Sequence, residues 1–451
     1  MNGFAIVMLA RPRGKAATVH TLQVAAAGAT TLLSFAVAML AFAFWRVSSP
    51  EPGYPILAIG LAGLLLVPLI TLGTATARLA ARSRDDRLAT LRLLGVTAAR
   101  VRALAVTEIT LMAAIGVLAG TLLAALLPLA LGPLTVYGEP LSATGLRLDR
   151  WLPWWIAGAI PPALVAIAAL SALFGLRRVV LSPLGVRTRQ EAPRLSWLRV
   201  LVAALAVGGA LLVVQFASPG WGVVVTVAAL TVAVLAIQGV LGLVGPFAIA
   251  LRAKRTASRT ADAATLVAAR GIEDDPRTAW RSVSALALAT FVLIPAGSLL
   301  GYLDTISRSQ SREIMTPDQL LLFADARTML VALVAVSFAV VACQTALTQT
   351  ATVLERRELS IALDRMGMPR STIDSTRARR ALSPTAFAVV GAALAAVIIA
   401  APLVFIAAAV APLFLLAAAL VLGLGLLLVR AGVAVTRPVL WAVLDAPARG
   451  E

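Results

Sequence analysis

Apolar residues occupy long uninterrupted runs of this chain, and the stretches between the runs are rich in arginine. Each run is about 20 residues or longer, the length that a helix needs to cross the hydrocarbon core of a membrane. The runs lie at 20–45, 55–77, 103–131, 153–176, 198–216, 221–251, 282–303, 328–350, 382–407 and 411–435. The pattern predicts an all-α polytopic membrane protein with about ten transmembrane helices.

The positive charges between the runs predict how the spans are oriented. Of the 39 Lys and Arg residues, 33 lie in the terminal segments or in every second loop. The other six lie in the alternate loops and are Arg46, Arg147, Arg150, Arg308, Arg312 and Arg327. Because Lys and Arg accumulate on the cytoplasmic side, we expect a multi-pass protein of the plasma membrane with both termini in the cytoplasm. The net charge of +18 is spread over all inner loops, which argues against nucleic acid as a partner.

The composition leaves few residues for chemistry. The chain is 60% hydrophobic and 13% charged, and its mean hydropathy is +0.94. One cysteine, Cys343, and one histidine, His20, exclude a disulfide framework and a Cys/His metal cluster. Neither of the two lysines, Lys15 and Lys254, belongs to a phosphate-binding loop. We therefore expect no catalytic residues, no metal site and no cofactor in this chain.

Two charged segments that each follow an apolar run are similar in sequence. The first reads Arg84-Asp-Asp-Arg-Leu-Ala-Thr-Leu-Arg-Leu-Leu-Gly95, and the second reads Arg356-Arg-Glu-Leu-Ser-Ile-Ala-Leu-Asp-Arg-Met-Gly367. When the glycines are aligned, both segments carry apolar residues at helical spacing. The glycines are 272 residues apart, and a Pro-aliphatic sequence that ends each following pair of spans recurs after 255 residues. We therefore expect two duplicated units of three spans, related by a pseudo-two-fold axis.

This repeat divides the chain into four regions. Residues 1–54 hold a cytoplasmic segment and the first span, and residues 55–190 form the first unit, with a cytoplasmic helix at about 84–104. Residues 191–327 add three spans and a short extracellular loop, and residues 328–445 form the second unit, with a cytoplasmic helix at about 356–376. Within the third region, the sequence Glu273-Asp-Asp-Pro276 predicts the end of a short helix and the cap of a new one that leads into the next span.

The two charged segments resemble the signature of FtsX-like permeases, in which basic and acidic residues precede aliphatic residues, a Leu-Arg-Ala-Leu-Gly sequence and small or basic residues. The resemblance implies the membrane subunit of an ATP-driven exporter, a type VII ABC system, whose cytoplasmic helices dock on separate ATPase subunits. The ten-span order is similar to that of permeases of the bacitracin-resistance type. Those carry a large extracellular domain, where this chain has only residues 304–327.

Partners and contact residues follow from the resemblance. It implies two copies of an ABC ATPase subunit, membrane lipids and a lipophilic substrate, which is a lipid, a drug or an antimicrobial peptide. ATP and Mg would be bound by the ATPase subunits, and this chain would not itself be an enzyme. The residues expected to contact the ATPase are Arg84, Asp86, Arg87, Leu91, Arg92, Gly95, Arg100, Glu108, Arg356, Arg357, Glu358, Leu363, Gly367, Pro369 and Arg370.

The second segment departs from the family signature at two positions. Asp364 stands where a basic residue is usual. Arg380 occupies the place of a glutamate that is common about thirteen residues after the glycine, and Glu108 matches that glutamate in the first unit. We therefore expect the two docking surfaces to be unequal.

Other interpretations of the same residues stay open at this point. The charged helices could simply anchor inner loops at the membrane surface, and Glu108 could pair with Arg100 or Arg102. The sequence Gly116-x-x-x-Gly120 could mark close helix packing. For the whole chain, the alternative functions are a secondary transporter, and a membrane sensor or scaffold coupled to a partner protein.

Overall fold

The computed structural model describes residues 15–49, 53–82, 97–144, 148–181, 223–308, 316–355 and 357–444, with isolated positions between 201 and 209. Contacts divide the chain into two compact units. Unit 1 comprises Met1–Phe35, Ile70–Leu126 and Pro153–Arg187, and unit 2 comprises Ala36–Leu69, Leu127–Leu152 and Thr188–Glu451. The units are treated separately below.

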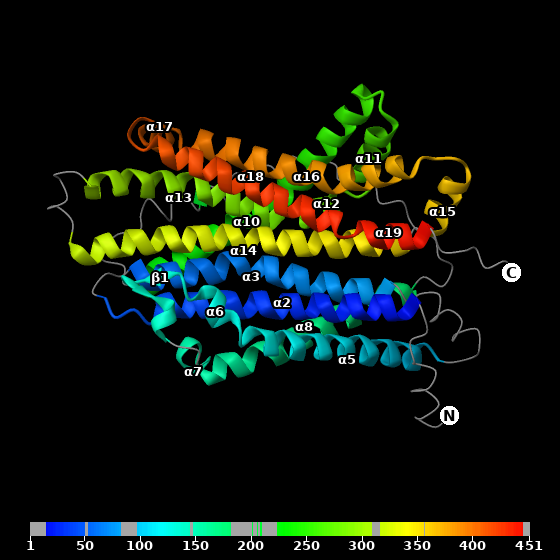
Figure 1. The fold of residues 1–451 in the computed structure, drawn as a ribbon, viewed down its shortest axis with the longest axis horizontal. Helices are drawn as coiled ribbons and strands as arrows, with labels where there is room; N and C mark the ends of the chain where they lie inside the picture. Colours follow the sequence, from blue (N-terminus) through cyan, green and yellow to red (C-terminus); the bar gives the residue numbers. More distant parts are fainter. Residues whose placement is uncertain are drawn as a thin grey trace. The chain divides into compact units, whose positions relative to one another are not determined.

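Nearly all of the described residues are helical (Figure 1). The elements are α2 (Lys15–Trp45), α3 (Gly53–Arg82), α5 (Ala98–Ala124), α6 (Leu127–Leu131), β1 (Thr135–Val136), β2 (Glu139–Pro140), η1 (Leu141–Thr144), α7 (Leu148–Trp151), α8 (Trp154–Leu181), α10 (Val223–Arg259), α11 (Ala263–Asp274), α12 (Pro276–Arg281), α13 (Ser284–Arg308), α14 (Pro317–Glu355), α15 (Arg357–Arg365), α16 (Arg370–Ile399), α17 (Ala401–Val410), α18 (Pro412–Ala434) and α19 (Arg437–Leu444).

Eight of the described helices contain a segment long and apolar enough to span a membrane. They are α2, α3, α5, α8, α13, α14, α16 and α18. The prediction of an all-α polytopic membrane protein is therefore confirmed. Of the two further expected spans, the one at 198–216 lies outside the described residues except at isolated positions. The one at 221–251 coincides with the long helix α10.

Two span boundaries differ from the sequence prediction. Helix α14 begins at Pro317 rather than near 328, because Thr316 and Gln319 form a capping box. The Gln319 N–H donates to Thr316 Oγ1 at 3.2 Å, and the Thr316 N–H donates to Gln319 Oε1 at 3.3 Å. The span expected to reach 407 ends at Ile399, and the short apolar helix α17 replaces its last turns. Pro402 lies in the first turn of α17, where a proline starts a helix but does not continue one.

Unit 1 contains a very close contact between α2 and α5. A Cβ atom on Gly116 would lie 2.5 Å from the Val24 carbonyl oxygen, and one on Gly120 would lie 2.5 Å from the Gly28 carbonyl oxygen. Such backbone approach requires glycine at both positions. The Gly116-x-x-x-Gly120 sequence is therefore a close-packing motif, and helix α8 packs along the same helix α5.

Unit 2 is built around a row of long helices, in which α13 lies beside α14 and α16, and α14 packs on α18 (Figure 1). Close approach again depends on small residues. The Phe338 ring of α14 fills the space over Gly425 of α18, and the Phe414 ring lies over Gly297 of α13. Helices α10, α11 and α12 pack beside α16, with buried Trp280 in their shared apolar core.

The acidic stretch in this region acts as the sequence predicts. Helix α11 ends at Asp274, and Asp275 caps α12 by accepting a hydrogen bond from the Thr278 N–H at 3.1 Å. Pro276 occupies the first turn of α12, where its missing N–H costs nothing. Helix α12 then leads into α13, which confirms the predicted helix start before this span.

Candidate partner-docking site

The second charged segment forms a helix, a bend and the start of another helix. Helix α15 ends at Arg365, and Gly367 has a φ of +89°, a left-handed conformation that favours glycine. The Met368 N–H bonds the Leu363 carbonyl and the Gly367 N–H bonds the Asp364 carbonyl, both at 3.0 Å. This is the Schellman arrangement that ends helices. The segment 356–376, expected as one helix, therefore bends at Gly367 and is divided between α15 and α16.

An ion pair crosses this bend. The Arg370 Nε at the start of α16 lies 3.2 Å from Asp364 Oδ1 near the end of α15. Both side chains are partly exposed, so the pair contributes about 0–1 kcal/mol to stability while limiting the angles that the bend adopts. The acidic residue at 364, a departure from the family signature, therefore has a local role, because a basic residue there would repel Arg370.

The bend also presents an exposed tip. Arg365, Met366, Gly367 and Pro369 are all exposed, and Met366 is an exposed apolar side chain with 73% of its surface accessible. A single exposed apolar residue is common on a protein surface, so Met366 is a candidate contact because of its place at the tip of the bend. Met366 aligns with Leu94 of the first segment, and sequence reasoning left both out of the contact residues.

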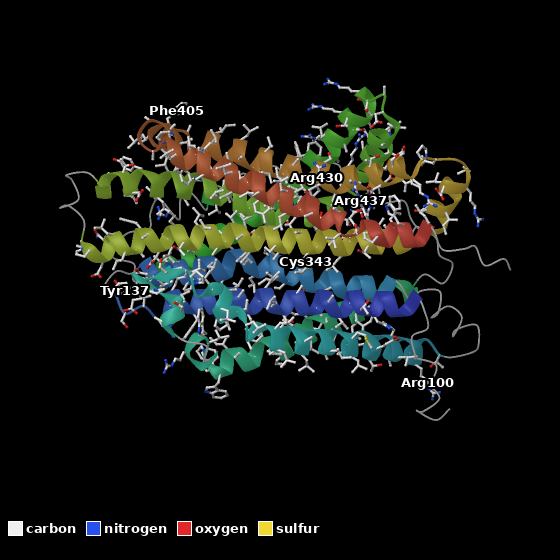
Figure 2. All side chains as sticks on the ribbon, in the orientation of Figure 1. Arg100, Tyr137, Cys343, Phe405, Arg430 and Arg437 are labelled. Carbon is white, nitrogen blue, oxygen red and sulfur yellow. The ribbon has the colours of Figure 1, made fainter. Side chains whose placement is uncertain are left out.

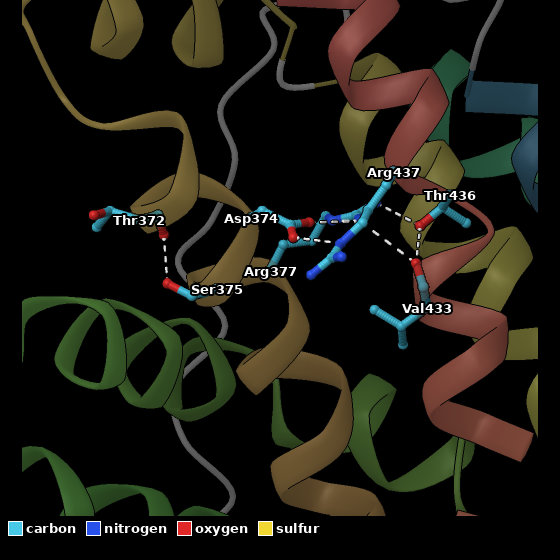
Figure 3. Close-up of polar contacts among 7 residues, drawn as sticks. All are labelled: Thr372, Asp374, Ser375, Arg377, Val433, Thr436 and Arg437. Carbon is cyan, nitrogen blue, oxygen red and sulfur yellow. Dashed lines mark hydrogen bonds and ion pairs between the residues drawn. The ribbon is translucent and has the colours of Figure 1, made fainter. Parts of the chain in front are cut away.

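Behind the tip, a buried carboxylate connects α16 to the end of α18 and the start of α19 (Figure 3). Asp374 is 9% exposed. Its Oδ1 accepts a hydrogen bond from Arg377 Nη2 at 2.9 Å, and its Oδ2 accepts one from Arg437 Nε at 2.7 Å. Arg377 also donates to the Thr436 hydroxyl and to the Val433 carbonyl. Both carboxylate oxygens of Asp374 and both terminal nitrogens of Arg377 are thus bonded, and these bonds hold α16 and α19 in one relative position.

Helix α19 completes the support of α15. The sequence predicted only an exit segment here, but Arg437–Leu444 forms a helix that packs against α15. Its Leu440 and Leu444 form a small apolar core with Val353 of α14 and Ile373 of α16. The tip is therefore supported by three helices, α14, α16 and α19, at one end of unit 2.

Helix α11 braces α16 from another direction. Asp262 caps α11 by accepting the Thr265 N–H at 3.0 Å, and the same carboxylate pairs with Arg379 of α16. Gly271 lies against the Arg380 guanidinium, because a Cβ atom there would be 3.1 Å from its Cζ. Arg380, the second departure from the signature, thus packs on α11.

Part of the expected contact set lies outside the described residues. This applies to Arg84, Asp86, Arg87, Leu91, Arg92, Gly95 and Arg356. Arg357 and Glu358 belong to α15, and Leu363 is half-buried near its end. In unit 1, Arg100 is exposed in the first turn of α5. Glu108 Oε1 lies 3.2 Å from His20 Nε2 of α2, a partner that sequence reasoning did not consider.

Comparison with known proteins relates one part of the chain to a family. Residues 58–183 match the family model described as FtsX-like permease C-terminal. This region is similar to an FtsX-like permease domain, and it lies within the first repeat unit expected at 55–190. The match supports the FtsX-like permease family for this membrane protein. No curated protein and no solved structure matches the chain.

Proposed function

We propose that this chain is the membrane subunit of an ATP-driven exporter of the type VII ABC kind, with separate ATPase subunits docking at 84–104 and 356–376. The FtsX-like region at 58–183 supports this proposal, because such permeases typically work with ATPase subunits. ATP and Mg are then bound by those subunits, and this chain converts their movement into transport.

The observation that carries the proposal is the exposed tip between α15 and α16. A partner that pushes on Met366 moves the bend between α15 and α16, and both of these helices are bonded to or packed on membrane spans. The Asp364–Arg370 pair restrains the bend, and Asp374 bonds α16 to α19. Because helices and buried ion pairs deform little, displacement at the tip reaches α14, α16 and α18 as displacement of whole helices.

The substrate that fits best is lipophilic. Residues 309–316 alone join α13 to α14, and the apolar helix α17 joins α16 to α18. Neither connection is long enough to form a domain that receives a soluble substrate. A lipid, a drug or an antimicrobial peptide enters directly from the membrane and needs no such domain.

Purification of the full chain from native membranes in mild detergent tests the proposal. We expect an ATP-hydrolysing subunit to co-purify, and the chain freed of it to hydrolyse no ATP. Met366→Ala should reduce the co-purified subunit about tenfold, the usual effect of truncating a residue that dominates an interface. Leu413→Ala is the matched control, because Leu413 is also apolar and 77% exposed but begins α18, at the opposite end from α19. A complex unaffected by Met366→Ala would contradict docking at the tip.

A further inference from the structure

Four side chains meet at the end of unit 2 that lies opposite α15. The charge pattern predicts that this end faces outward. Asp325 of α14 is 2% exposed. Its Oδ2 accepts a hydrogen bond from the Tyr54 hydroxyl of α3 at 2.8 Å and another from the Tyr137 N–H at 2.8 Å. The Tyr137 hydroxyl donates to Asp318 Oδ1 at 2.7 Å. Figure 2 labels Tyr137 toward one end of unit 2 and Arg437 toward the other.

Tyr137 lies in the turn of the hairpin formed by β1 and β2, and the conformation of this turn positions it for its bonds to Asp325 and Asp318. Tyr137 and Gly138 form its two-residue turn, with φ values of 54° and 78°, which are typical of a type I′ turn. A tyrosine in this left-handed region is strained, and such strain persists only where the surroundings fix it. Here its N–H, its hydroxyl and its ring are all engaged, since the ring lies edge-on to Tyr54 at 5.9 Å between centroids. The bond to Asp318 also raises the pKa of Tyr137 above its ordinary value, at which the phenol is already protonated at physiological pH.

The contact joins the two helices that lead into the charged segments. Helix α3 continues to Arg82, just before the first segment, and α14 continues to Glu355, just before the second. Beside Tyr54 the two helices touch closely, because a Cβ on Gly53 would lie 2.4 Å from Leu322 Cδ2. The Gly53–Leu322 and Tyr54–Asp325 contacts each join positions about 270 residues apart. This separation is close to the 272 residues between Gly95 and Gly367. The expected repeat thus makes α3 and α14 equivalent helices, in contact at equivalent heights.

We propose that Tyr54, Tyr137, Asp318 and Asp325 form a clasp that stays closed during transport and serves as the pivot for α3 and α14. Opening it would leave the Asp325 carboxylate buried at the membrane without donors, which is strongly unfavourable. Movement driven at the two charged segments therefore turns the helices about their clasped ends. The pivot role rests on the proposed function, whereas the closed clasp is a property of the chain itself.

A disulfide placed beside the clasp tests the proposal. In a Cys343→Ala background, Gly53→Cys and Leu322→Cys bring two Cβ atoms within disulfide reach, since the Gly53 position lies 3.2 Å from Leu322 Cγ. In the isolated chain we expect rapid and nearly complete bond formation under mild oxidation. Adding Asp325→Ala should slow bond formation about tenfold, the loss expected for hydrogen bonds to a charged group. Tyr302→Phe is the matched control and should leave the rate unchanged, because no described residue bonds the Tyr302 hydroxyl.

The same disulfide decides whether the clasp is a pivot. With the purified ATPase complex and Mg-ATP, we expect the oxidised protein to keep at least about half of its hydrolysis rate. A tenfold loss that a reductant reverses would show that these ends separate during the cycle, and slow bond formation in the isolated chain would show that they are not clasped. Either result overturns the proposal. Failure of the proposed function is distinct, because the reduced protein would then show no hydrolysis while the disulfide still formed.

Discussion

Asp374→Ala should destabilise the inner end of unit 2 more than any other single change in its polar cluster. The Asp374 carboxylate accepts hydrogen bonds from two arginines, and its removal leaves the Arg377 guanidinium buried without its anion. Arg377 is only 8% exposed. Water therefore has little access to the uncompensated charge, which is why such substitutions are costly.

The magnitude follows from the two partners. Removing one member of a buried ion pair costs about 3–5 kcal/mol. We expect about 3 kcal/mol, at the low end of that range, because Arg377 keeps its bonds to Thr436 and Val433. Arg437→Ala should cost only about 0–1 kcal/mol, since the Arg437 side chain is 61% exposed.

Unfolding of the purified full chain in detergent, followed by tryptophan fluorescence, measures these free energies. The double variant Asp374→Ala with Arg377→Ala should recover roughly 1–2 kcal/mol relative to Asp374→Ala, because it removes the stranded charge. Equal costs for Asp374→Ala and Arg437→Ala would refute the reasoning, as would strict additivity in the double variant.

Three further predictions use other parts of the chain. The Gly367→Trp variant should insert into the membrane normally but transport poorly. The Gly367→Asn variant should stay active, because asparagine tolerates a left-handed φ. Equal activity of the two variants in an export assay would contradict the role of the bend. Gly116→Leu should lower the melting temperature of the chain by separating α2 from α5, while Gly63→Ala, where nothing lies within 4 Å, should be neutral or slightly stabilising; similar melting of both variants would contradict the close contact. Reporter fusions after residue 142 should give an extracellular signal and fusions after residue 360 a cytoplasmic one, and the opposite pattern would reverse the predicted topology.

The features that can be predicted well from the sequence are those that depend on local sequence alone. Runs of apolar residues identify the spans because a membrane helix needs little else. The bend after α15 is predictable because Gly367 and Pro369 follow an amphipathic segment, the usual sequence of a helix end. The start of α14 was predictable too, since Thr316-Pro-Asp-Gln319 is a capping sequence. Hydrophobicity alone places the boundary near 328, because charged and polar residues lie among the first turns of α14.

The features that could not be predicted depend on tertiary contacts between residues distant in sequence. Asp374 and Arg437 are distant in sequence, and either could have been an ordinary inner-loop charge, so nothing local indicates that they meet. The same holds for Tyr54 and Asp325, which lie on helices that only the fold brings together. Glu108 shows the limit most clearly, because neighbouring arginines were the natural partners and the structure instead pairs it with His20 of another helix.

Site-specific photo-cross-linking from position 366 tests the central claim most directly. A photoreactive residue replaces Met366 in the full chain, and another replaces Leu413 as the matched control at the opposite end of unit 2. The proposed docking predicts that illumination in native membranes links position 366, but not position 413, to a subunit that binds and hydrolyses ATP. An ATPase complex that remains active yet shows no cross-link from position 366, or links equally to position 413, would contradict it.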